Sequence, residues 1–217
     1  MIKVLNLYAG IGGNRKLWPS DKIEVTAIEL NPDIAAIYRG FFPNDNLIIG
    51  DAHEYLLNHY EEFNFIWSSP PCPSHSIVRR LPFRKNGEMV THKPLYPDMT
   101  LYQEIIFLMY NFKGNWVIEN VRSYYTPLIT PQELQRHYFW SNCVFNKKKF
   151  EADLVRNGKN HERANSFGFD YDKITNVDKT KVLRNCVSPE LGLFLFNECF
   201  KNKQLDLNPH IENENNQ

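Results

Sequence analysis

The chain has 217 residues, and its 25 basic side chains are balanced by 25 acidic ones, so the formal net charge at pH 7 is zero. Any affinity for nucleic acid must therefore come from local basic patches. Hydrophobic residues make up 42 % of the chain, enough to fill one core. No apolar run approaches the ~18 residues of a membrane span, and four irregularly spaced cysteines outline no disulfide framework. We expect a cytoplasmic protein without a membrane segment.

Three apolar segments near the start each end in residues suited to ligand binding. A strand over residues 3–8 runs into a glycine-rich turn, residues 9–13, whose backbone can approach a ligand closely. A second strand, residues 23–28, ends at Glu29, near the position at which an acidic residue receives ribose hydroxyls in dinucleotide-type folds. A third, residues 46–49, ends at Asp51. Helices expected over 32–42 and 52–59 complete an alternation that predicts a doubly wound α/β sheet.

A fourth apolar segment, residues 63–67, leads into Ser68-Ser69-Pro70-Pro71-Cys72. The prolines stiffen the turn, so the thiol of Cys72 is held at a strand exit, where open α/β sheets bind ligands. Alone, Cys72 is explained equally well as a small buried hydrophobe. The sequence of Gly, Glu, Asp and Cys at four successive strand ends favours a nucleophile. Cys72 and His75 lack a second Cys or His pair, so we expect no metal site.

The next part of the chain, to residue 140, adds a loop, a helix and two strands. Residues 73–97 have no clear period, and long ordered loops of this kind are usually functional. A helix is expected to run to Phe112 with Asp98 as its N-cap and Leu101, Ile105, Leu108 and Met109 at core positions. Residues 115–118 form a strand that ends at Glu119-Asn120-Val121, and residues 138–140 are expected in the sheet core.

These motifs, in this order, resemble the DNA cytosine-5 methyltransferase family over most of residues 1–200. The resemblance implies a Rossmann-like fold that uses S-adenosylmethionine as cofactor. It implies a cofactor site formed by Tyr8, Ala9, Gly10, Ile11, Gly12, Gly13, Glu29, Leu30, Asp51, Ala52, Pro71, Asn185 and Val187. It also implies three catalytic residues, namely Cys72, Glu119 and Arg136.

The chain departs from the family pattern at three places. Leu134 stands where the first of two paired arginines is usual, and Pro73 replaces the glutamine that commonly follows the cysteine. The target-recognition region is unusually short. The expected division is a catalytic domain (1–141), a reduced target-recognition region (142–183), a helix completing the catalytic domain (184–200) and a polar tail (201–217).

The resemblance implies that Cys72 adds to carbon 6 of cytosine and thereby activates carbon 5, while Glu119 acts on ring nitrogen 3 and Arg136 on the carbonyl oxygen. The partner expected is double-stranded DNA with a flipped cytosine, bound by a monomer of bacterial or phage origin in restriction-modification or phage protection. Candidate contacts to nucleic acid are Arg79, Arg80, Arg84, Arg156, Lys159 and Arg163. Arg79 and Arg80 are also expected to favour the thiolate of Cys72.

Two alternatives stay open at this point. One is an RNA cytosine-5 methyltransferase of the transfer-RNA branch, which shares most of these motifs. The other is a catalytically idle relative that only binds nucleic acid. A methyltransferase acting on an exocyclic amine would carry an aromatic residue where this chain has Cys72.

Overall fold

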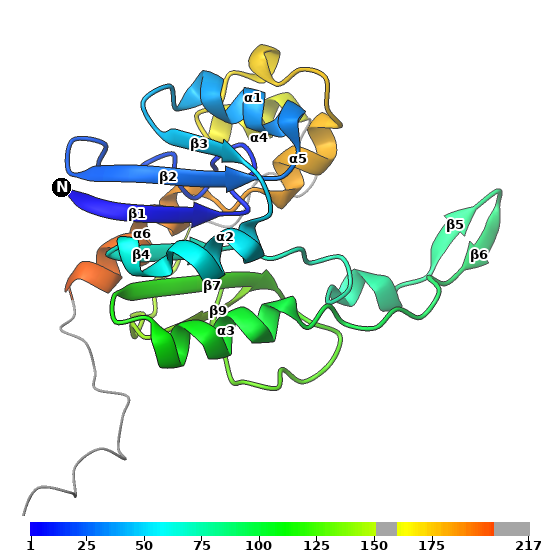
Figure 1. Cartoon of the computed structure of the whole chain (residues 1–217). Coiled ribbons are helices and arrows are strands. Elements are labelled where there is room, and N and C mark those ends of the chain that lie inside the picture. Colours follow the sequence, from blue (N-terminus) through cyan, green and yellow to red (C-terminus); the bar gives the residue numbers. More distant parts are fainter. Residues whose placement is uncertain (151–159, 202–217) are drawn as a thin grey trace, which may run out of the picture.

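A seven-stranded sheet runs through the molecule, which is seen here in a computed structural model that describes residues 1–150 and 160–201. The strand order is β3-β2-β1-β4-β7-β9-β8, and the first five strands are parallel (Figure 1). The last two strands are antiparallel to their neighbours. The sheet consists of β1 (Ile2–Leu7), β2 (Ile23–Glu29), β3 (Asn46–Ile49), β4 (Phe65–Ser68), β7 (Asn115–Val121), β8 (Gln132–Leu134) and β9 (His137–Ser141).

Helices cover both faces of this sheet, as the expected doubly wound α/β fold requires. Successive residues of a strand point to opposite faces. Leu5 and Leu7 of β1 therefore join a cluster with α2 (Ala52–His59) and α3 (Thr100–Asn111), whereas Val4 joins a cluster with α6 (Pro189–Lys201). The buried central strands explain why their sequences are nearly continuous apolar runs. The fold class expected from the sequence is confirmed.

The chain between the sheet and α6 shares its core with the catalytic part. It contains α4 (Asn160–Ser166) and α5 (Lys179–Asn185), with a 3-10 turn at Tyr171–Lys173 between them. Their apolar side chains pack with α1 (Pro32–Phe41) and with Ala9 and Ile11 of the glycine-rich turn. The role of residues 142–183 in target recognition stays a prediction. The expected polar tail lies outside the described residues, apart from Lys201.

The segment expected as a plain loop, residues 73–97, has structure of its own. A 3-10 turn, Ile77–Arg80, is followed by a hairpin of β5 (Phe83–Lys85) and β6 (Glu88–Val90). This arm, defined as residues 77–96, reaches away from the sheet (Figure 1). The expectation of a segment without strands was wrong, because three-residue strands are too short to give a readable alternation.

The start of α3 also differs from expectation. Met99 occupies the N-cap position, and the Asp98 carboxylate instead accepts a hydrogen bond from the Thr100 amide at 3.0 Å. Leu101, Ile105 and Leu108 are buried as expected. Met109 is 42 % exposed and does not belong to the core. A further 3-10 turn, Tyr60–Glu62, links α2 to the loop before β4.

Candidate active site

The strand ends singled out in the sequence lie at one edge of the sheet. Strands β1, β2, β3, β4 and β7 are parallel, so the residues that follow them meet at their common carboxyl edge. This edge carries the glycine-rich turn after β1, Glu29, Asp51 and the Cys72 turn, and it includes Glu119 near the end of β7. The arrangement forms a ligand site of the kind that open α/β sheets build.

The glycine-rich turn fits a bound nucleoside. Gly10 has φ +56°, and a side chain added to it would meet no atom within 4 Å, so the turn is open on that side. The Gly10 amide donates to Glu29 Oε2 at 2.9 Å, and the Asn31 amide donates to Oε1 at 2.9 Å. These two bonds fix the orientation of the Glu29 carboxylate. That carboxylate is only half-buried, so it stays accessible to a ligand, and its expected role at a ribose stays a prediction.

The far side of the same turn rests on the segment before α6. A Cβ added to Gly13 would lie 2.6 Å from the carbonyl oxygen of Val187, which is closer than real Cβ atoms approach. Only glycine therefore allows this contact. Cys186 and Val187 are buried, whereas Asn185 is exposed. The segment closes the back of the turn, and the roles of Asn185 and Val187 in a cofactor site stay predictions.

The other cofactor candidates divide by exposure. Leu30 is 68 % exposed, which leaves an apolar face free beside Glu29. Asp51 is also exposed, and it caps α2 by accepting from the Glu54 amide at 3.0 Å. Three of the candidates are buried, so they can contact a ligand through the backbone and not through the side chain: Ala9, Ile11 and Ala52. Pro71 is exposed, and Gly12, like Gly10, has a positive φ.

Tyr8 holds the entrance of the glycine-rich turn in an unusual conformation. Its φ is +54°, in the left-handed region that costs a residue with a side chain about 1–2 kcal/mol. The Tyr8 hydroxyl donates to the carboxylate of Glu104, on α3, at 2.7 Å. Burial and that carboxylate raise the pKa of Tyr8, so it stays a neutral donor. This contact offsets the backbone cost.

The Cys72 turn is held by residues on both sides. The Cys72 carbonyl accepts from the amides of His75 and Ser76, at 3.0 and 3.1 Å. Asn120 of β7 is 1 % exposed, and its amide donates to the carbonyl of Pro70 at 3.0 Å. The sequence predicted Asn120 as part of a motif after a strand but indicated no role for its side chain. Its role follows only from the pairing of β4 with β7, which brings it beside the prolines.

The Cys72 thiol is half-buried, and its pKa is raised rather than lowered. The main cause is burial, and the second is the negative charge of Glu119. The expectation that Arg79 and Arg80 would favour the thiolate was wrong for this structure. Arg79 instead donates to the Lys93 carbonyl at 2.8 Å, and Arg80 lies over the ring of Tyr124, 5.0 Å from its centroid. Both arginines are occupied within or beside the arm.

Glu119 has a partner that the sequence did not reveal. Its Oε1 lies 2.6 Å from Nδ1 of His137, and both side chains are about nine-tenths buried. The pairing of β7 with β9 sets Val121 opposite His137, which brings the imidazole next to Glu119. Arg136 lies beside His137 in the two-residue turn that joins β8 to β9, and it is half-buried. His137 therefore belongs to the site together with Glu119.

The expected contacts to nucleic acid are only partly accessible. Arg80 and Arg84 are exposed, and Arg79 is partly so. Arg163 is only 8 % exposed, so the expectation that it contacts nucleic acid was wrong, and it contributes positive charge beside the Cys186 thiol instead. Its helix α4 is in contact with α5. Arg156 and Lys159 lie outside the described residues.

Comparison with known proteins assigns the family. The sequence profile of the C-5 cytosine-specific DNA methylase family matches residues 2–137. The chain belongs to this family. The match spans the glycine-rich turn, the Cys72 turn, Glu119 and His137, so the resemblance drawn from the sequence is confirmed.

Two relatives from the same insect illustrate the similarity. The chain is 28 % identical over 105 residues to a tRNA (cytosine(38)-C(5))-methyltransferase of Spodoptera frugiperda, which covers 46 % of this chain and 29 % of that protein. It is 25 % identical to the crystal structure of a mutant DNMT2 of Spodoptera frugiperda, with a TM-score of 0.37, over 56 % of this chain and 36 % of the other. The chain thus spans less than a third of the length of the curated relative.

S-adenosylmethionine, the cofactor expected from the resemblance, is the methyl donor of this family. The open glycine-rich turn and the oriented Glu29 carboxylate fit it.

Within residues 1–150 and 160–201, no group of three or more His, Cys, Asp or Glu side chains is placed to hold a metal ion. His75 instead contacts the Tyr125 hydroxyl at 2.6 Å. None of the described helices is long and apolar enough to cross a membrane.

Proposed function

We propose that the protein transfers a methyl group from S-adenosylmethionine to carbon 5 of cytosine in DNA. The observation that carries this proposal is that the Cys72 thiol and the Glu119 carboxyl lie at the same sheet edge as the glycine-rich turn, close enough for the charge of Glu119 to raise the pKa of Cys72. A thiol beside a carboxyl suits addition to a pyrimidine ring, because one group attacks while the other protonates the ring.

The proposed reaction begins with attack of the Cys72 thiolate on carbon 6 of a flipped cytosine. Glu119, in the protonated form that the bound base requires, gives a proton to ring nitrogen 3, and electron density moves to carbon 5. S-adenosylmethionine supplies the methyl group that carbon 5 accepts. A base then removes the proton from carbon 5, the bond between Cys72 and carbon 6 breaks, the double bond between carbons 5 and 6 is restored, and the proton on ring nitrogen 3 returns to Glu119. In this scheme Arg136 binds the carbonyl oxygen, and His137 holds Glu119 in place.

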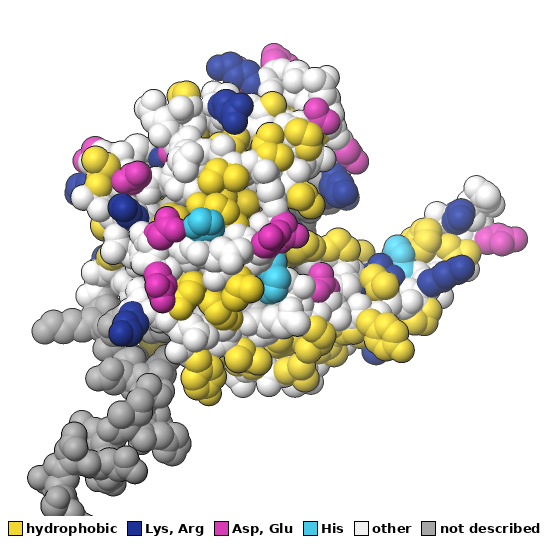
Figure 2. All heavy atoms as spheres, viewed as in Figure 1, with side chains coloured by type: hydrophobic (Ala, Val, Ile, Leu, Met, Phe, Trp, Pro, Cys, Tyr) yellow, Lys and Arg dark blue, Asp and Glu magenta, His cyan; other side chains and the backbone are white. Residues whose placement is uncertain are grey.

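The arm is the surface best suited to contact the nucleic acid. It carries Arg79, Arg80, Arg84, Lys85 and Lys93, against Glu88 as its acidic residue. Basic side chains there alternate with exposed apolar ones, and Figure 2 shows both kinds together along the arm. Positive charge beside apolar surface favours a partner with phosphates and stackable bases. The arm begins five residues after Cys72. A cytosine bound at Cys72 would therefore lie near the end of the arm that joins the sheet. Extrusion of that cytosine from a duplex costs a few kcal/mol.

Transfer RNA is the second candidate acceptor. The observation that favours it is the similarity to the Spodoptera frugiperda relative, which is a tRNA (cytosine(38)-C(5))-methyltransferase. Both acceptors call for the same chemistry at Cys72 and Glu119. They differ in the surface that holds the nucleic acid.

Expression in a bacterium that lacks cytosine-5 methylation tests the proposal. Base-resolution mapping of 5-methylcytosine in total DNA and in total RNA from the same cells should show new methylated positions in DNA. Cells that express Cys72→Ser should show none. New marks in tRNA alone would replace DNA by RNA as the acceptor. Marks that persist with Cys72→Ser would reject the covalent mechanism.

A further inference from the structure

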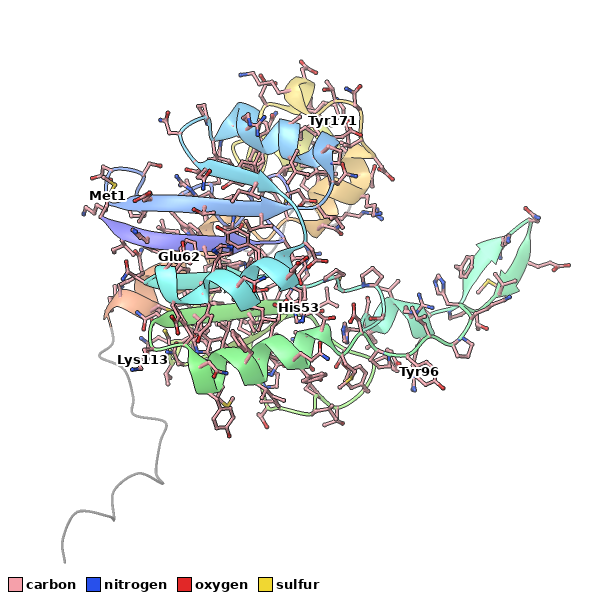
Figure 3. All side chains as sticks on the ribbon, in the orientation of Figure 1. Met1, His53, Glu62, Tyr96, Lys113 and Tyr171 are labelled. Carbon is pink, nitrogen blue, oxygen red and sulfur yellow. The ribbon has the colours of Figure 1, made fainter. Side chains whose placement is uncertain are left out.

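A buried carboxylate behind the glycine-rich turn takes no part in the chemistry described above. Glu104 of α3 has no exposed surface. Its Oε1 accepts from the Tyr8 hydroxyl at 2.7 Å, and its Oε2 accepts from the Ser68 hydroxyl at 2.6 Å. Nδ1 of His53 lies 3.1 Å from Oε1. His53, labelled in Figure 3, reaches Glu104 from α2, so three segments of the chain converge on one carboxylate.

The partners of Glu104 require an acceptor at both of its oxygens. Tyr8 and Ser68 each donate an O–H, and the imidazole can donate its Nδ1–H. Burial raises the pKa of Glu104, and the hydrogen bonds from Ser68, Tyr8 and His53 offset only part of that rise. An amide of the same shape accepts at one atom only. Glu104→Gln therefore keeps the packing and forces one hydroxyl to give up its present bond.

The two hydroxyls mark the exits of two neighbouring parallel strands. Leu7, the last residue of β1, pairs with Ser68, the last residue of β4. Tyr8 then opens the cofactor turn, and the nucleophile Cys72 lies four positions after Ser68. A shift of the chain at the end of either strand changes the distance from the Tyr8 or the Ser68 hydroxyl to the Glu104 carboxylate. Glu104 is thus joined directly to both halves of the site.

We propose that Glu104 is a positioning residue that couples the conformation of the S-adenosylmethionine turn to that of the Cys72 turn. The part concerning Cys72 rests on the proposed function. The coupling predicts crossed effects. Loss of the Ser68 hydroxyl should weaken cofactor binding, although Ser68 is not in the glycine-rich turn. Loss of the Tyr8 hydroxyl should change the reactivity of Cys72, although Tyr8 is not in the Cys72 turn.

Two measurements test the coupling, and neither needs a nucleic-acid substrate. Calorimetry gives the affinity for S-adenosylhomocysteine, and the rate of iodoacetamide labelling of Cys72, followed by peptide mass spectrometry, reports the state of its turn. Cys143, Cys186 and Cys199 are buried, so the peptide that contains Cys72 is the one labelled in the folded protein. Glu104→Gln should lower the affinity about tenfold and change the labelling rate severalfold, since a buried hydrogen bond is lost. Ser68→Ala and Tyr8→Phe should each lower the affinity for S-adenosylhomocysteine, as Glu104→Gln does. Each should also change the labelling rate of Cys72 in the same direction as Glu104→Gln.

Glu198→Gln is the matched control. Glu198 of α6 is also a buried glutamate, 3 % exposed, and it accepts from the Asn146 side chain at 2.7 Å. This variant should change neither the cofactor affinity nor the labelling rate. The coupling is rejected if Ser68→Ala leaves the affinity unchanged and Tyr8→Phe leaves the labelling rate unchanged. These single variants keep the test decisive if Glu104→Gln does not fold. A failure to find methylated DNA would affect the proposed acceptor and leave these results in force.

Discussion

Nδ1 of His137 lies 2.6 Å from Oε1 of Glu119, within a site where both side chains are nearly enclosed. The two residues are 18 positions apart and meet across the antiparallel pairing of β7 and β9. A carboxyl that must give a proton to a substrate ring needs a fixed orientation, and the imidazole supplies one. His137 is therefore as much a part of the proposed acid as Glu119 itself.

We expect His137→Ala to lower kcat for methyl transfer about 10- to 100-fold and to leave the affinity for S-adenosylmethionine unchanged. A buried carboxyl left without its partner costs about 1–3 kcal/mol, and the cofactor turn is a separate part of the site. Steady-state kinetics and calorimetry measure the two effects. Tyr138→Phe is the control, because Tyr138 packs in the cluster on the α2 and α3 face of the sheet. Equal losses in both variants would contradict a specific role for His137.

Labelling of Cys72 should depend on pH in a way set by its raised pKa. The thiolate is the reactive form, so the rate of iodoacetamide labelling should rise with pH, with a midpoint above the value of about 8.5 for an unperturbed cysteine. Glu119→Gln removes the second cause of the shift, the carboxylate charge, and should lower the midpoint. Glu88→Gln at the exposed tip of the arm should not move it. A midpoint that is the same with and without Glu119 would exclude the charge effect.

Glu29→Ala and Asp51→Ala should each weaken cofactor binding by about 1–3 kcal/mol, because each substitution leaves polar groups of the bound nucleoside unpaired. Glu29→Ala also releases the Gly10 and Asn31 amides, so its effect should be the larger. Calorimetry measures the affinity of each variant for S-adenosylmethionine. Glu24→Ala, an exposed position on the same strand as Glu29, is the control and should bind normally. Normal binding by both test variants would remove these residues from the site.

Replacement of basic residues on the arm should weaken nucleic-acid binding without changing the methylated sequence. Arg80→Ala and Arg84→Ala each remove an exposed charge, and loss of one phosphate contact lowers the salt slope of binding by about 1. Fluorescence anisotropy at several salt concentrations measures the slope. Arg39→Ala, at an exposed position near the end of α1, should leave it unaltered. If Arg84→Ala relaxed the sequence at one position, the arm would instead read bases.

Sequence reasoning succeeded where a residue's task depends on its immediate neighbours. Gly10 and Gly13 were identified from the backbone freedom of a turn: Gly10 has a positive φ that glycine adopts without cost, and Gly13 has room only for glycine beside Val187. It failed for Arg163, which looked like a surface charge in a basic cluster and is buried. Exposure depends on which helices pack over a residue, and local composition carries little information about that.

The sequence by itself determined the order of the strands' exits, the glycine-rich turn and the proline-stiffened turn at Cys72, because glycine and proline restrict the backbone wherever they occur. Only the tertiary structure decided which side chains meet there. Tyr8 and Glu104 are 96 positions apart, and Ser68 and Glu104 are 36 apart. Such contacts are set by strand register and by how α3 lies on the sheet, and a one-residue slip in register would turn each strand side chain to the opposite face.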